Sequence, residues 1–285
     1  MIFKVVMTIV LAQAVRSRVD DRDPASQCLW WPENTAIQLR LSVAGNPETP
    51  AETEFAAIVA AVNTWQTKLS ACASVSLTEG ERTRTRKVGF FDKEPNENIA
   101  VFRVRRCSET APAGDACHGE ADNCGNQFDC WQHQEAAIAI TTTSYNPNTG
   151  RILDSDIEFN APTFTFSTVD APPCLAGMNR TSCVAADIQN TTTHELGHLL
   201  GLSHSPAVGS TMSFRANPGE LSKRVLDADS ARFVCEVYPM GRPAQTCFLE
   251  PVSPELGAAA KGCQAAPGGL LLAIAGLLLR RRRLS

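Results

Sequence analysis

The chain has 285 residues, of which 44% are hydrophobic, and these values suit one large or two modest globular domains. Its net charge of −4 comes from acidic and basic residues mixed along the chain, with no basic stripe before the extreme C-terminus, which argues against nucleic acid as a partner. Eleven cysteines, without two CxxC pairs at zinc-finger spacing, indicate disulfides formed in an oxidising compartment.

The first 14 residues have the features of a secretory signal peptide. Lys4 precedes a short apolar run over 5–12, and the small-x-small sequence at 12–14 is a cleavage site. Residues 15–27 are charged and carry no apolar pattern, so we predict a flexible mature N-terminus there.

Residues 36–104 carry alternating strand and helix signals. Alternation of apolar and polar residues predicts a half-buried strand at 36–41, and a helical period with one broad apolar face predicts a long helix over 52–69. Short strands are predicted at 75–77, 87–91 and 99–104. This order indicates an α/β layer with the helix packed behind the sheet.

The stretch 105–134 interrupts this pattern, because it is rich in Cys, Gly and Asp. We interpret it as an insertion stapled by disulfides. Its histidines, His118 and His133, are interpreted as exposed loop residues in preference to metal ligands. Its acidic residues are interpreted as solvated, because they form no clear Ca²⁺ motif; they are Asp115, Glu120 and Asp122.

Two later runs predict a β-hairpin. Residues 136–145 are rich in β-branched side chains, 152–159 alternate apolar with acidic residues, and 146–150 between them have turn chemistry. Further on, Cys174 and Cys183 bracket a short loop and are predicted to form a bridge.

A cluster of histidines follows on a helix predicted to run from Asp187, its N-cap, to residue 200. His194 and His198 are four residues apart, so they share one helix face and can bind one zinc ion. Glu195 lies beside them as a candidate general base. A glycine at 201 ends the helix, and the turn brings back His204 as third ligand, which leaves a coordination position open as in catalytic zinc sites.

The short HExxH pattern alone also fits histidines buried in a core. The extended form HExxHxxGxxH, followed by Ser-Thr-Met at 210–212, favours zinc and resembles the metzincin clan of zinc endopeptidases. Ser205, directly after the third histidine, is similar to the matrixin branch. The resemblance implies a Met-turn methionine, Met212, beneath the metal, and it extends upstream to the sequence TGRILDSDIEFN at 149–160.

The matrixin resemblance also implies a fold and a substrate site. It implies a catalytic domain over 28–239 with a twisted mixed sheet, a backing helix, an active-site helix and a C-terminal helix at 226–238 capped by Asp227 or Asp229. The first hairpin strand would form the sheet edge above the cleft, where an extended peptide adds as another strand. Residues 214–224 would wrap the substrate pocket, with Phe214 where some relatives have a tyrosine. Matrixin propeptides place a cysteine on the zinc, but for Cys28 a disulfide is favoured.

The C-terminal residues carry a separate signal. Residues 240–262 are interpreted as a linker and 263–285 as a sorting tail, in which Gly262-Cys263 precedes an apolar stretch at 270–279 and four arginines. This stretch is short for a bilayer span, and the arrangement resembles the C-terminal sorting tails of myxobacterial surface proteins, cut by a sorting protease. A plain tail anchor is the alternative.

The sequence therefore predicts an exported zinc endopeptidase, on the cell surface (outer membrane) or outside the cell, that acts on proteins or peptides. Zn²⁺ is the expected cofactor, and ten cysteines are expected in five disulfides, with Cys263 left over. The alternative is a non-catalytic surface adhesin with a zinc-stabilised fold, against which Glu195 argues, because a structural site needs no base.

Overall fold

The structure is a computed structural model that describes residues 14–119, 124, 127–175, 182–244 and 247. The signal peptide before Ala14, most of the expected linker and the whole expected tail lie outside the described residues. Within the described ranges, no helix is both long and apolar enough to cross a bilayer.

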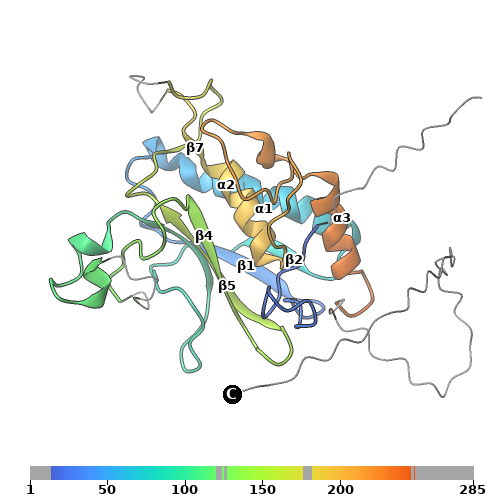
Figure 1. The fold of residues 1–285 in the computed structure, drawn as a ribbon. Helices are drawn as coiled ribbons and strands as arrows, with labels where there is room; N and C mark the ends of the chain where they lie inside the picture. The colour runs from blue at the N-terminus through green and yellow to red at the C-terminus, as the bar shows by residue number, and fades with distance from the viewer. Residues whose placement is uncertain (1–13, 120–123, 125–126, 176–181, 245–246, 248–285) are drawn as a thin grey trace, which may run out of the picture. The chain divides into compact units, whose positions relative to one another are not determined.

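A five-stranded mixed sheet is the centre of the fold (Figure 1). Its order is β2-β1-β3-β5-β4; the first three pairs are parallel, and β4 runs antiparallel to β5. The predicted hairpin is confirmed, with Thr141 opposite Ile157, and β4 forms one edge of the sheet. The strands are β1 (Ala36–Leu41), β2 (Ser76–Glu79), β3 (Asn98–Arg103), β4 (Ala139–Tyr145) and β5 (Ile152–Asn160), with a separate parallel pair of β6 (Phe166–Ser167) and β7 (Ala186–Asp187).

The helices α1 and α2 pack against this sheet, and Figure 1 shows them lying together over it, while α3 packs against α1. The helices are α1 (Thr53–Cys72), α2 (Ile188–Leu199) and α3 (Ala228–Val237), and the short 3₁₀ turns are Pro50–Glu52, Cys107–Glu109, Ala116–Gly119 and Ser222–Arg224. The apolar face of α1 buries Ile58, Val62 and Trp65 in the main core. The indole N–H of Trp65 donates to the carbonyl of Thr193 at 2.8 Å, so the backing helix contacts α2 one residue before the first histidine. The α/β fold class is confirmed.

The predicted strand at 87–91 is wrong. Gly89 has φ +101°, a left-handed conformation that interrupts an extended strand. The backbone N–H groups there bond to side chains instead of a neighbouring strand: Gly89 N–H donates to Asp156 at 2.6 Å and Phe90 N–H to Ser144 at 3.2 Å. Residues 87–91 therefore form a loop, although their composition is typical of a β-strand.

Ten cysteines form five disulfides, as the sequence predicts. The expected bridge between Cys174 and Cys183 is present, and Cys28 is a disulfide partner. The full set is Cys28–Cys247, Cys72–Cys235, Cys107–Cys130, Cys117–Cys124 and Cys174–Cys183.

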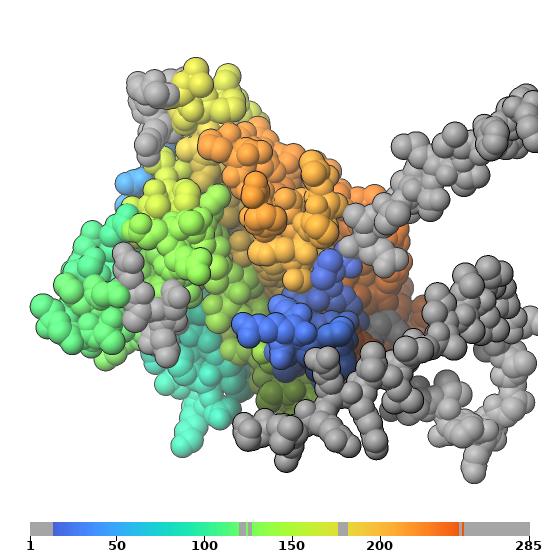
Figure 2. Space-filling model, viewed as in Figure 1, coloured from blue at the N-terminus to red at the C-terminus, as the bar shows by residue number. Residues whose placement is uncertain are grey.

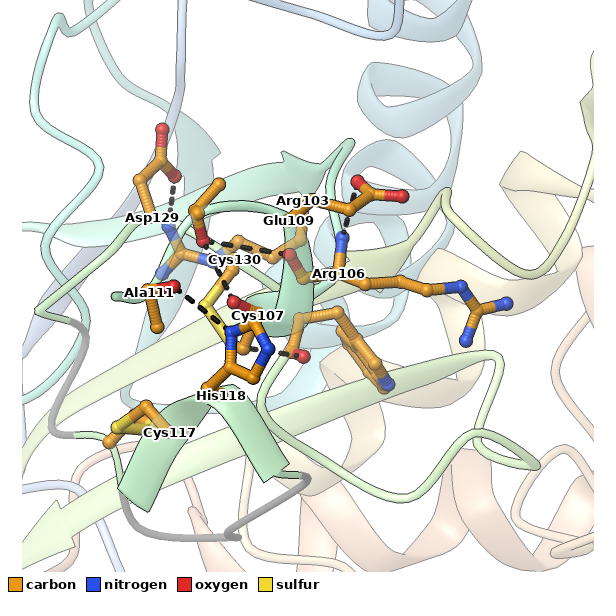
Figure 3. The surroundings of a disulfide bond; sticks show 12 residues. Arg103, Arg106, Cys107, Glu109, Ala111, Cys117, His118, Asp129 and Cys130 are labelled. Carbon is orange, nitrogen blue, oxygen red and sulfur yellow. Dashed lines mark hydrogen bonds and ion pairs between the residues drawn. A yellow bond between two sulfur atoms is a disulfide. The ribbon is translucent and has the colours of Figure 1, made fainter. Parts of the chain in front are cut away.

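The Cys-rich insertion is attached to the sheet through the buried Arg103, whose ion pair with Asp129 is drawn in Figure 3. Arg103, on β3, is fully buried; its Nε lies 2.7 Å from Glu158 on β5 and its Nη1 2.5 Å from Asp129 in the insertion. His133 was expected to be an exposed loop residue, but its Nε2 lies 2.9 Å from the second oxygen of Glu158. Neither His133 nor His118, whose Nδ1 lies 3.1 Å from the carbonyl of Ala111, joins a metal-binding group in the described part of the chain.

The acidic residues of the insertion hold no calcium motif in the part that the structure describes. Asp115 accepts a hydrogen bond from the N–H of Cys117 at 2.8 Å, which is turn chemistry. Glu120 and Asp122 lie outside the described residues.

The N-terminal segment 14–28 is paired, although its sequence carries no apolar pattern. Arg16 forms an antiparallel bridge with Leu202, in which Ser17 N–H donates to Gly201 O at 2.9 Å and Ser203 N–H donates to the carbonyl of residue 15 at 2.7 Å. The segment is therefore held against the loop that leads from α2 to His204.

Candidate metal centre

Three histidines meet at the C-terminal part of α2. The helix starts at its predicted cap, since Asp187 accepts a hydrogen bond from Asn190 N–H at 2.7 Å, and it carries His194 and His198 one turn apart. Gly201, with φ +90°, turns the chain; a Cβ there would lie 2.9 Å from the carbonyl of Leu29. The turn returns His204, and one nitrogen from each imidazole lies within 4.8 Å of the others.

The distance between two of these nitrogens fits a zinc ion. His198 Nε2 and His204 Nε2 are 3.2 Å apart, and two nitrogens bound tetrahedrally at about 2.0–2.1 Å from zinc are separated by about 3.3 Å. Among the described residues no oxygen cluster of comparable kind is present, so Ca²⁺ gains no support.

Hydrogen bonds set the tautomers that a metal requires. The Nδ1 atoms of His194 and His198 lie 2.7 Å and 2.8 Å from the carbonyl oxygens of Thr211 and Leu202. A carbonyl only accepts, so each Nδ1 carries the hydrogen and each Nε2 keeps a free lone pair. Burial lowers the pKa of all three imidazoles, and that of His194 falls well below the usual value, which favours the neutral rings that a metal ion requires.

Glu195 projects into the same site without belonging to the histidine cluster. Its carboxylate accepts a hydrogen bond from the Thr141 hydroxyl at 2.7 Å, and the same hydroxyl lies 3.1 Å from the Glu195 carbonyl. Burial raises the pKa of Glu195 to about 7, although the Thr141 bond and the nearby positive charge of Lys223 oppose the rise. A carboxyl group of this kind exchanges a proton near neutral pH.

Met212 packs beneath α2. It is buried, and a Cβ built on Gly197 would lie 2.2 Å from its sulfur, so a larger residue at that place on the helix would displace the Met212 side chain. The Met212 carbonyl accepts from Ser205 N–H at 2.8 Å. The segment 205–212 therefore begins directly after His204 and also carries the Thr211 carbonyl that orients His194.

A cleft of 680 Å³ opens over the histidines. The face shown in Figure 2 carries the N-terminal segment in dark blue, β4 in green and the segment after α2 in orange. Phe214, 62% exposed, lines the cleft, and its ring centroid is 6.2 Å from that of His204. The predicted pocket-forming segment contributes Phe214, Arg215, Ala216, Asn217 and Lys223 to the lining.

Several lining residues carry no sequence signal of their own. Ser17, Arg18 and Asp21 reach the cleft only because the N-terminal segment folds back onto the third-histidine loop. Thr141 lines the cleft because β4 lies at the edge of the sheet. Lys223 lies in a polar segment without periodicity.

Comparison with known proteins agrees with this geometry. No curated protein matches the chain. The family model for Matrixin matches residues 30–239, which include both the sheet and the histidine cluster. Since this match covers well over half of the 285 residues, the chain belongs to the matrixin family, and it is a zinc-dependent metalloendopeptidase.

Proposed function

We propose that His194, His198 and His204 hold the zinc and that Glu195 is the general base of peptide-bond hydrolysis. The observation that carries this proposal is the position of Glu195, which shares one cleft with three neutral imidazoles and is held by Thr141. When bound, zinc lowers the pKa of a coordinated water and polarises a carbonyl. Glu195 takes the proton from the attacking water and passes it to the leaving amine.

The supporting residues fix the reacting groups. Thr211 and Leu202 orient two imidazoles through their carbonyls, and Met212 supports the helix from below. Thr141 fixes the carboxylate of Glu195, so its free oxygen points in one direction. An extended polypeptide substrate adds along the outer edge of β4, because that edge borders the cleft.

The test is Glu195→Gln. We expect proteolysis of a peptide library to fall by about 10²–10⁴-fold, while the bound zinc, measured by elemental mass spectrometry, stays at the wild-type content. Glu94→Gln, at an exposed ion pair with Lys87, is the control and keeps full activity. Loss of zinc in the Glu195 variant would make Glu195 a ligand. A wild-type protein that binds zinc yet cleaves nothing would favour the adhesin alternative.

We further propose export and the domain plan of the sequence analysis: a signal peptide at 1–14, the catalytic domain at 28–239 and a processed tail at 263–285. Five disulfides support an oxidising compartment. Cys263→Ser should block processing of the tail, so that the unprocessed form accumulates in the cell envelope on immunoblots. Normal processing of this variant would leave the tail as a plain anchor.

A further inference from the structure

A buried lysine in the cleft has no ion-pair partner among the residues that the structure describes. Lys223, in the 3₁₀ turn Ser222–Arg224, is 4% exposed and lines the cleft together with His194 and Glu195. Its ammonium donates to two backbone carbonyls, those of Ser213 at 2.7 Å and Arg215 at 2.8 Å. Within the described residues, no carboxylate lies within ion-pair distance of it.

Among the described residues, this arrangement leaves the positive charge of Lys223 without a counter-ion and one of its N–H donors without an acceptor. An ammonium has three N–H donors, and two are accounted for. A buried charge is costly unless a counter-charge compensates it. Carbonyl oxygens compensate only in part, and burial accordingly lowers the pKa of Lys223.

The two carboxylates whose charges act on Lys223 are engaged elsewhere. Glu220 accepts from Asn217 N–H at 2.9 Å and from the Ser222 hydroxyl at 2.8 Å, and Glu195 is bonded to Thr141. Both act on Lys223 only from a distance, where they oppose the lowering of its pKa.

The lysine stands in a fixed position relative to the histidines. Its backbone N–H donates to the side-chain oxygen of Asn190 at 2.8 Å, and Asn190 lies on α2, one turn before His194. The exposed Arg215 adds a second positive charge to this part of the cleft lining, and its guanidinium lies 5.1 Å from the centroid of the Phe214 ring.

We propose that Lys223 binds a carboxylate of the substrate at the residue flanking the scissile bond. The carboxylate comes either from an Asp or Glu side chain or from the free C-terminus of a peptide cut near its end. A carboxylate supplies the missing counter-charge and accepts the third N–H. This inference rests on the proposed peptidase function and names its substrate preference.

The experiment begins with wild-type enzyme and a peptide library, from which one cleaved sequence is taken. Matched fluorogenic peptides then carry Glu or Gln beside the scissile bond, each as free acid and as C-terminal amide. We expect kcat/KM to be roughly 10- to 100-fold higher for the carboxylate that Lys223 binds than for its neutral analogue. A Glu over Gln preference identifies a side chain, and an acid over amide preference identifies the C-terminus.

Lys223→Met should bring this ratio close to one, while Lys87→Met, which removes an exposed lysine, should keep it. Because Lys223 also braces the loop 213–215, the wild-type ratios still test the inference if the Met variant does not fold. A folded Met variant that keeps the wild-type ratio would assign the preference to another charge of the lining, such as Arg215, and would overturn the inference. Equal cleavage of all four peptides by the wild-type enzyme overturns the inference and leaves the peptidase function intact. Failure of the zinc-loaded wild type to cut any library peptide refutes the function itself.

Discussion

The ion pair between Arg103 and Glu158 should be among the most sensitive points of the fold. Both side chains are fully buried, and together with Asp129 and His133 they join the Cys-rich insertion to β3 and β5. Glu158→Gln keeps the shape of the side chain but removes its charge. Arg103 then stays buried and loses the charge of its fully buried partner, while its pair with the half-exposed Asp129 remains.

The expected loss follows from this burial. Breaking a buried pair by neutralising one partner costs about 3–5 kcal/mol of unfolding free energy. Since each kcal/mol lowers the Tm of a domain of this size by roughly 2–4 °C, the melting temperature should fall by about 6–20 °C. The matched control is Glu97→Gln, because Glu97 pairs with Arg40 at 2.9 Å with both side chains partly exposed; there the loss should stay below about 1 kcal/mol.

The loss should also depend on pH. Burial alone would raise the pKa of Glu158, but the His133 hydrogen bond and the Arg103 charge together hold that pKa below 4.5. A carboxyl group with a lowered folded-state pKa stabilises the fold above its unfolded pKa, and this contribution disappears as the pH falls through the folded value. The difference in unfolding free energy between wild type and Glu158→Gln should therefore be largest at pH 7 and should become smaller below about pH 4.5.

The assay is urea unfolding of the non-reduced protein, followed by circular dichroism, with Glu195→Gln in both backgrounds to prevent self-digestion. A loss below about 1 kcal/mol at pH 7, or a gap that stays constant from pH 7 to pH 3, would refute the reasoning.

Further predictions concern the proposed general base, the disulfide between α1 and α3, and zinc. Thr141→Val should lower kcat/KM by roughly tenfold or more at unchanged zinc content, because a hydrogen bond to a charged group contributes about 1.5–3 kcal/mol, whereas Thr142→Val, at the neighbouring position of β4, should not change the rate. Replacing Cys72 and Cys235 together by Ala should cost about 2–5 kcal/mol, measured as a lower urea midpoint, since this bridge ties the end of α1 to α3 across 163 residues. Removing zinc with a chelator should abolish cleavage and lower the Tm, and added Zn²⁺ should restore both; a Tm unaffected by the chelator would show that the histidines bind no metal.

The sequence alone was sufficient where a local rule determines the structure. The four-residue spacing of His194 and His198, the glycine at 201 and the cap at Asp187 are helix geometry. The helical period at 52–69 predicted α1, and the matrixin resemblance at 226–238 predicted α3. The prediction of a strand at 87–91 was wrong because composition does not reveal the positive φ of Gly89 or its hydrogen bond to Asp156.

Residues that depend on distant partners escaped the sequence analysis. The residues around His133 in the sequence are typical of a loop. Its contact with Glu158 forms only because β5 lies beside the insertion in the folded protein. Lys223 carries no periodic signal, and its burial results from the turn of the chain after Met212. Long-range contacts of this kind are set by the whole fold, which local patterns do not encode.

The bridge between Arg16 and Leu202 also sets an order of events during biosynthesis. A chain made from its N-terminus exposes residues 15–17 long before residues 201–203, yet each segment supplies hydrogen bonds to the other. The disulfide from Cys28 waits longer still, for residue 247. Contacts so far apart in sequence form slowly, because the intervening chain must close a large loop first. The loop bearing His204 is therefore completed only after nearly the whole domain has been synthesised. Until then the nascent chain lacks the complete three-histidine site.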